Sequence, residues 1–154
     1  MAGASAALAG LIMIAISVNI KEVLHFPSVS ARAAAAIAAL VVAVVASCVA
    51  LMPQPVLAMG IELLVAVAVL WPIQVHAFRA LMAPSPGDAG DRRSTPWRVS
   101  SGILGLLPPF GFTIGGALLV AGMDAGAFAI AFGSVIAVVS AVLFAWVAMV
   151  EILR

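Results

Sequence analysis

Glu62 and His76 lie within one apolar run of this 154-residue chain and are the residues best suited to do chemistry. Glu62 and His76 are separated by 14 positions. On a helix this spacing places them about 40° apart around the axis and about 21 Å apart along it. They cannot touch, but together they could line one polar path, because an ionisable group within a membrane is costly and indicates function by default. The alternative is structural: Glu62 as a protonated or water-exposed carboxyl near the membrane surface, and His76 as an interfacial side chain.

A double proline near the middle of another apolar run is the second candidate. Pro108 and Pro109 remove two backbone donors, and Pro109 disfavours the helical conformation of the residue before it. We therefore expect a kink or a break here. The freed carbonyls of Leu104 and Gly105 could line a cavity or coordinate an ion, as in the discontinuous helices of transporters. A kink whose backbone groups are satisfied by neighbouring helices is the alternative.

Recognisable catalytic patterns are absent from the sequence. It contains no G-x-G-x-x-G, Walker, H-E-x-x-H, C-x-x-C or G-x-S-x-G motif. With two histidines and one cysteine, no nucleophile and base can be paired from their spacing, so we expect no enzyme. We also expect no cofactor. The one cofactor hypothesis is a haem or pigment ligated by His25 and His76.

The composition indicates the environment in which these residues act. Hydrophobic residues make up 66% of the chain and charged residues 8%, whereas an average soluble domain is about half apolar and about a quarter charged. The mean hydropathy is +1.30. A net charge of +1 gives no footprint for nucleic acid. We therefore predict an integral membrane protein that contacts the lipid bilayer.

Five apolar runs are each long enough to cross a bilayer, which takes about 20 residues. They cover about 4–24, 33–52, 56–78, 99–121 and 126–153, and a polar loop at about 79–98 separates the third from the fourth. Residues 1–154 are thus predicted as a single transmembrane domain. The predicted fold is all-α, a polytopic bundle of five transmembrane helices.

The positions of the basic residues predict the orientation of this bundle. All seven fall on one side of a five-helix arrangement: Lys21, Arg32, Arg79, Arg92, Arg93, Arg98 and Arg154. Basic residues concentrate on the cytoplasmic side of membrane proteins. The N-terminus is therefore expected outside, and the loop at 79–98 and the C-terminus in the cytoplasm. Because the high alanine and glycine content fits a GC-rich bacterial genome, we expect a multi-pass protein of a bacterial inner membrane.

Stripes of small residues suggest how the helices pack, because small side chains let membrane helices approach closely. The last run carries Ala129, Gly133, Ala137, Ala141 and Ala145 at four-residue spacing, and the second carries Ala31, Ala35, Ala39, Ala43 and Ser47. Composition alone could also produce such stripes. The sequence leaves open whether the contacts lie within one chain or between copies. In the first run, Ser17 and Asn19 are further candidates for contacts between helices.

The start of the chain resembles a known family. The opening Gly3-Ala-Ser-Ala-Ala-Leu-Ala-Gly10-Leu-Ile-Met-Ile-Ala-Ile-Ser17-Val-Asn19-Ile is followed by Phe26-Pro27-Ser28 and Arg32-Ala33-Ala34. This pattern resembles a family of small, uncharacterised multi-helix bacterial inner-membrane proteins that share a Gly-Leu-(apolar)-Ser-x-Asn first helix. The likeness covers the first third of the chain. It implies that Ser17 and Asn19 matter to the family pattern, and it implies no particular activity.

Two functional hypotheses follow. The first is a non-enzymatic membrane protein that acts through helix–helix contacts, either as a homo-oligomer or as an accessory subunit of an inner-membrane complex. It rests on the small-residue stripes and the shortness of the loops. The alternative is a small ion or proton channel or transporter that uses Glu62, His76 and a helix broken at Pro108 and Pro109.

Overall fold

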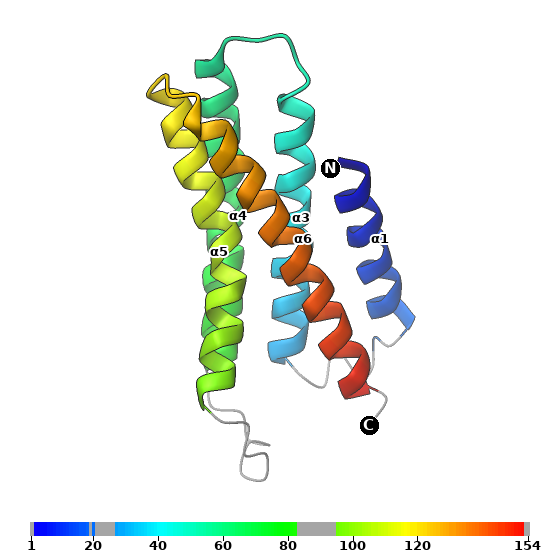
Figure 1. Ribbon diagram of the computed structural model, residues 1–154. Helices are drawn as coiled ribbons and strands as arrows, with labels where there is room; N and C mark the ends of the chain where they lie inside the picture. Colours follow the sequence, from blue (N-terminus) through cyan, green and yellow to red (C-terminus); the bar gives the residue numbers. More distant parts are fainter. Residues whose placement is uncertain (1, 19, 21–26, 83–94, 153–154) are drawn as a thin grey trace.

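The chain folds into a bundle of helices that run alternately up and down (Figure 1). The computed structural model describes residues 2–18, 20, 27–82 and 95–152, with side chains at 2–18, 20, 30–80, 82 and 105–146. Its helices are α1 (Ala2–Val18), α3 (Pro27–Val49), α4 (Val56–Met82), α5 (Thr95–Val120) and α6 (Ala125–Ile152). The prediction of an all-α protein with five helices is therefore confirmed.

The helix bounds differ from the apolar runs where helices continue into polar sequence. α3 begins at Pro27, ahead of the predicted 33, and proline is well suited to the first position of a helix because its backbone nitrogen needs no partner there. α4 continues beyond the predicted 78 to Met82, with Arg79 in its last turn. Such a basic side chain can extend to the membrane surface while the backbone stays helical.

Three helices contain stretches that are long and apolar enough to cross a membrane: Ser30–Val49, Val56–Ala80 and Ala125–Trp146. The apolar stretches Ala2–Val18 of α1 and Gly105–Val120 of α5 are shorter in the described part of the chain. At about 1.5 Å per residue, α1 is about 25 Å long, slightly less than the hydrocarbon thickness of about 30 Å. These spans indicate a multi-pass membrane protein.

The helices form a four-helix bundle with one helix added on its outside. α5 packs between α4 and α6, and α3 contacts both α4 and α6, which closes the bundle. α1 packs mainly against α3 and more lightly against α6 (Figure 1). The connections from α3 to α4 and from α5 to α6 lie at the upper end of Figure 1, and α6 ends at the lower end.

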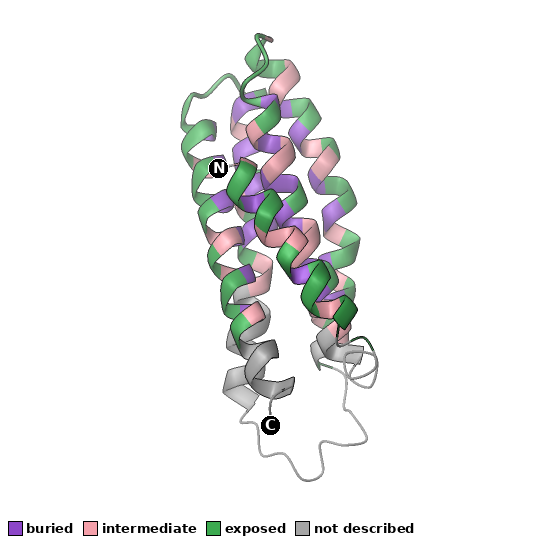
Figure 2. Cartoon of the chain, turned by 90° about the vertical axis from the view of Figure 1, so that its right-hand side faces the viewer, coloured by how far each residue is buried: buried purple, intermediate pink, exposed green. Residues whose placement is uncertain are grey.

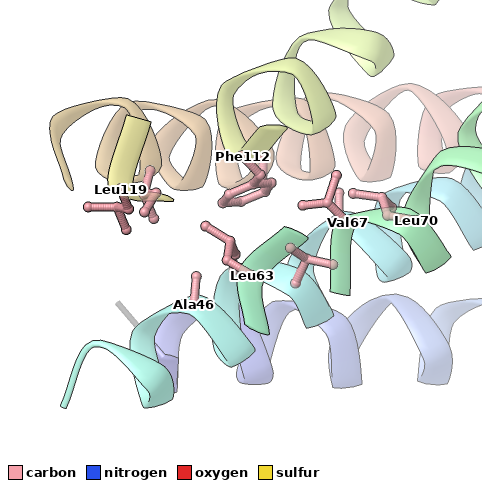
Figure 3. Close-up of a cluster of buried hydrophobic side chains, with 11 residues drawn as sticks. Ala46, Leu63, Val67, Leu70, Phe112 and Leu119 are labelled. Carbon is pink, nitrogen blue, oxygen red and sulfur yellow. The ribbon is translucent and has the colours of Figure 1, made fainter. Parts of the chain in front are cut away.

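The core lies where α3, α4, α5 and α6 meet. Phe112 of α5 is fully buried and its ring lies beside Leu63 and Val67 of α4, while Ala46 of α3 packs in the same cluster (Figure 3). Exposed positions lie along the outer sides of the helices (Figure 2). Many of them carry large apolar side chains, among them Phe128 at 80% exposure. An apolar exterior of this extent fits a surface covered by lipid.

Glycines set the distance between α5 and α6. A Cβ atom on Gly111 would lie 2.9 Å from the Cα of Gly133, and one on Gly126 would lie 2.6 Å from the carbonyl oxygen of Gly115. The obstructing atoms belong to the backbone, so they cannot move aside independently of their helix. The two helices therefore approach so closely at these points that only glycine fits, which is the packing that small residues permit in membranes.

The expected break at Pro108 and Pro109 is not present. α5 is helical without interruption from Thr95 to Val120, with both prolines inside it. Both prolines are almost completely buried. A proline removes one donor from the helical ladder but leaves the other bonds in place, and packing against neighbouring helices can stabilise the helix through such a gap. The prediction of an interruption at the two prolines is therefore wrong.

Candidate functional site

Glu62 lies on the outward face of α4, close to the upper end of the bundle. Its side chain is exposed, and Oε2 accepts a hydrogen bond of 3.1 Å from Nε2 of Gln54 in the connection before α4. Side chains on a helix tilt toward its N-terminus, so the carboxyl group extends toward the start of α4, where Gln54 lies. The carboxyl of Glu62 thus has a hydrogen-bond partner in the connection before its own helix, and not on a neighbouring helix.

His76 is exposed on the same face of α4, about four turns farther along. From Glu62 to His76, the residues of α4 at alternating steps of three and four positions are all exposed. We call this set the α4 stripe, and its members are Glu62, Val65, Val69, Pro72 and His76. The spacing is that of a left-handed helix–helix seam.

The α4 stripe points away from the bundle. The buried positions of α4 occupy the opposite side of the helix: Gly60, Leu63, Val67, Leu70, Gln74 and Ala77. At about 100° per residue, the centres of the two sets are separated by roughly half a turn. The stripe therefore faces whatever surrounds the bundle, and it lines no interior space between the helices.

The four candidates for a polar path do not come together. Glu62 and His76 face outward from α4, whereas Pro108 and Pro109 of α5 are buried in the bundle. A path through the protein would need these groups to line one common space. The arrangement instead separates an outward surface with two polar side chains from an interior packed with apolar side chains.

A polar contact that the sequence analysis missed joins α4 to α5. Nε1 of Trp71 donates a hydrogen bond of 3.1 Å to Oγ1 of Thr113, and Oγ1 of Thr113 donates one of 2.6 Å to the carbonyl oxygen of Pro109. The Trp71 ring also meets the ring of Phe110 edge to face, with centroids 5.0 Å apart. A tryptophan N–H needs a partner when it is buried, so an indole within an apolar run was an available signal.

A second missed contact joins α4 to α3. Gln74 is 4% exposed, and its Nε2 donates a hydrogen bond of 3.1 Å to the carbonyl oxygen of Ala35. Gln74 is an amide within an apolar run, as Glu62 is a carboxyl, and could have been singled out on the same ground. The buried polar group of α4 is therefore this amide, which stabilises the contact between two helices.

The small-residue stripe of α6 lies at contacts within the chain. Gly133, Ala137 and Ala141 are buried, while Ala129 and Ala145 are half-buried. Figure 2 shows such buried positions along the inner sides of the helices. The stripe of α3 is arranged in the same way: Ala35, Ala39 and Ala43 are buried, and Ala31 and Ser47 are half-buried. These faces are occupied by other helices of the same chain.

The remaining candidates lie at or beyond the edge of the described residues. Ser17 is exposed on α1, and Asn19 and His25 lie outside the described residues. The hypothesis of a haem or pigment on His25 and His76 is therefore not assessed by this structure. Within the part of the chain that is described, no group of three His, Cys, Asp or Glu side chains is arranged to hold a metal ion.

One aromatic and basic pair lies at the lower end of the bundle. The guanidinium carbon of Arg32 in α3 lies 5.5 Å from the centre of the Phe144 ring in α6. A guanidinium over an aromatic face is attracted by the ring quadrupole and remains charged. This contact anchors one of the basic residues near the end of the bundle that we predicted to be cytoplasmic.

Comparisons of the chain with models of protein families, with curated proteins and with solved structures find no match.

Proposed function

We propose that this protein acts without catalysis, through helix–helix contacts in a bacterial inner membrane, as a homo-oligomer or as an accessory subunit of a larger complex. In this proposal all five helices cross the membrane. The N-terminus lies outside and the C-terminus in the cytoplasm, so the upper end of Figure 1 faces outward.

The observation that carries the proposal is the outward direction of the α4 stripe. Carboxyl and imidazole groups within membrane helices almost always face the interior of a bundle or a water-filled cavity, because exposure to lipid is costly. Glu62 and His76 face away from the interior of this chain. The polar side chains of such a surface find hydrogen-bond partners on another helix more readily than in lipid, and the apolar side chains between them can pack against the same helix.

The packing of the interior supports the same proposal. The small-residue faces of α3 and α6 are occupied within the chain. Of the three buried polar side chains in the described residues, Gln74 and Ser134 each donate a hydrogen bond to a backbone carbonyl, while the hydroxyl of Ser5 in α1 has no hydrogen-bond partner. The described interior thus offers no row of polar groups between the two ends. The channel or transporter alternative has less support, because its four residues do not face a common space.

The orientation follows from the basic residues. Arg32 near the start of α3 and Arg79 in the last turn of α4 both belong to the lower end, and the other five Lys and Arg residues fall in sequence at the same ends of the helices. The described connection between α3 and α4 and that between α5 and α6 contain no Lys or Arg. The positive-inside rule then assigns the lower end to the cytoplasm.

The experiment that tests this proposal is native mass spectrometry of the protein released gently from its own membranes. A complex of several copies, or one with a different membrane protein at fixed stoichiometry, is the expected result. A strictly monomeric protein with bound lipid and no protein partner would contradict the proposal.

A further inference from the structure

We propose that the α4 stripe is the docking surface for one transmembrane helix of a different protein, which carries Lys or Arg level with Glu62 and a carboxylate level with His76 and Arg79. This inference rests on the proposed function and specifies its partner. It commits to an accessory subunit rather than to a homo-oligomer.

The geometry of the stripe fits a single helix. Its five residues recur at alternating steps of three and four positions, the spacing at which two helices keep contact along a left-handed seam. Most bundles of transmembrane helices cross in this way. Val65 and Val69 in the middle of the stripe are 62% and 65% exposed, so the seam has an apolar centre that this chain leaves uncovered.

The ends of the stripe specify the chemistry of the partner. At the upper end, the carboxyl of Glu62 accepts one hydrogen bond from Gln54, and a carboxylate has room for several. At the lower end, the exposed side chains of His76 and Arg79 are donors or cations. A helix with the opposite arrangement, basic above and acidic below, would pair with both ends at once. Charge-assisted hydrogen bonds of this kind are the stronger ones where water is scarce.

A second copy of this chain does not fit the stripe as well. In a symmetric pair of α4 helices, each residue meets its own counterpart or a near neighbour, so carboxyl would lie against carboxyl and Arg79 against Arg79. An asymmetric pair fails for another reason. The two basic residues whose side chains the structure describes, Arg32 and Arg79, lie at the lower end of the bundle, and every copy shares one orientation in the membrane. Neither of them can then lie level with Glu62 of another copy.

Site-specific photo-crosslinking in native membranes tests the surface. A photoreactive phenylalanine analogue replaces Val65 or Val69 in the stripe, or, as the matched control, Val135 or Val139 on the outer face of α6. All four are exposed valines on apolar helices. We expect an adduct with one different membrane protein from the two α4 positions and none from the two α6 positions. Mass spectrometry of the adduct identifies the partner and its crosslinked helix.

A charge exchange tests the chemistry. Glu62→Gln is expected to lower the adduct yield from position 69 at least about fivefold, since it removes the charge but keeps the size of the side chain. Glu62→Lys should abolish the adduct, and replacing the basic residue of the partner helix by Glu should restore it. Normal amounts of both variants in the membrane show that they insert.

The remaining outcomes overturn the inference in different ways. An adduct of two copies of this chain would make the stripe a homo-oligomer seam. A partner adduct whose yield is unchanged in both Glu62 variants would remove the role of the carboxyl. Adducts from the α6 positions alone would agree with the proposed function but would show that the partner binds α6 and not the α4 stripe. No adduct from any position, together with a monomer in native mass spectrometry, would refute both.

Discussion

The indole Nε1 of Trp71 in α4 donates a hydrogen bond of 3.1 Å to Oγ1 of Thr113 in α5. Elsewhere along the same pair of helices, Gly60 of α4 lies against Gly116 and Val120 of α5. Trp71 is next to Pro72 in α4, and Oγ1 of Thr113 donates to the carbonyl oxygen of Pro109 in α5. A bond between side chains therefore joins the two helices close to residues that lack a backbone donor.

Removing this bond should weaken the bundle measurably. Thr113→Val keeps the shape of the side chain but removes the hydroxyl, and it leaves the Trp71 N–H without its partner. We expect the free energy of unfolding to fall by about 1 kcal/mol, as is usual for a single hydrogen bond between membrane helices. Reversible unfolding in mixed detergent and SDS micelles, followed by tryptophan fluorescence, measures the change.

Ser134→Ala is the control for that variant. It removes a hydroxyl that donates only to the carbonyl oxygen of Ile130 within its own helix, at 2.9 Å. Such a bond competes with the helical ladder, so its loss should alter stability by less than about 0.5 kcal/mol. Equal effects of the two variants would show that the bond between α4 and α5 contributes nothing specific.

Two glycines of α5 should respond in opposite ways to substitution by alanine. A Cβ atom on Gly111 would lie 2.9 Å from the Cα of Gly133, whereas one on Gly105 would meet nothing within 4 Å. Gly111→Ala should therefore push α5 and α6 apart and lower stability by about 1–3 kcal/mol. Gly105→Ala should be neutral or should stabilise by up to about 1 kcal/mol through the helix propensity of alanine. The same unfolding measurement separates them, and an equal loss in both variants would contradict the close approach of the two helices.

The sequence predicted the helices well but predicted poorly which way their faces turn. Apolar length and the Pro and Gly breaks were sufficient to find five helices. Which side of each helix faces the core could not be predicted from the sequence, because the core-facing and outward-facing sides are both apolar. The sequence therefore left open whether Glu62 lines a path or has a structural role near the surface, and its side chain faces outward.

Partners distant in the sequence could not be inferred for a related reason. The carbonyl group that Gln74 binds belongs to Ala35, on another helix, and only the register of the two helices brings them together. Small residues carried more information, because their four-residue spacing marks one side of a helix whatever surrounds it. Ala137 and Ala141, two members of the predicted stripe of α6, are fully buried.

The proposed orientation predicts which loops a reagent outside the cell can reach. In a Cys48→Ala background, which removes the natural thiol, a single cysteine replaces Met52 or Asp124 at the upper end, or Ser85 between α4 and α5. A membrane-impermeant maleimide should label the first two positions in intact spheroplasts. It should label position 85 only after the membrane is permeabilised, because the basic residues near that segment place it in the cytoplasm. The reverse pattern would show that the protein has the opposite orientation. Labelling of positions 52 and 124 from different sides of the membrane would show that α4 or α5 does not cross it.

Flux measurements distinguish contact between helices from conduction. Vesicles of phosphatidylethanolamine and phosphatidylglycerol that contain the purified protein should hold a proton gradient about as long as empty vesicles do. The reason is that the described interior is apolar around Phe112, and Glu62 and His76 face outward. Glu62→Gln should leave this slow leak unchanged, while it disrupts complex formation in the membrane. A wild-type protein that dissipates the gradient, with a rate that falls in Glu62→Gln, would contradict the proposal and restore the channel hypothesis. A protonophore, added at the end of each recording, shows that a proton gradient was still present in the vesicles and could be released.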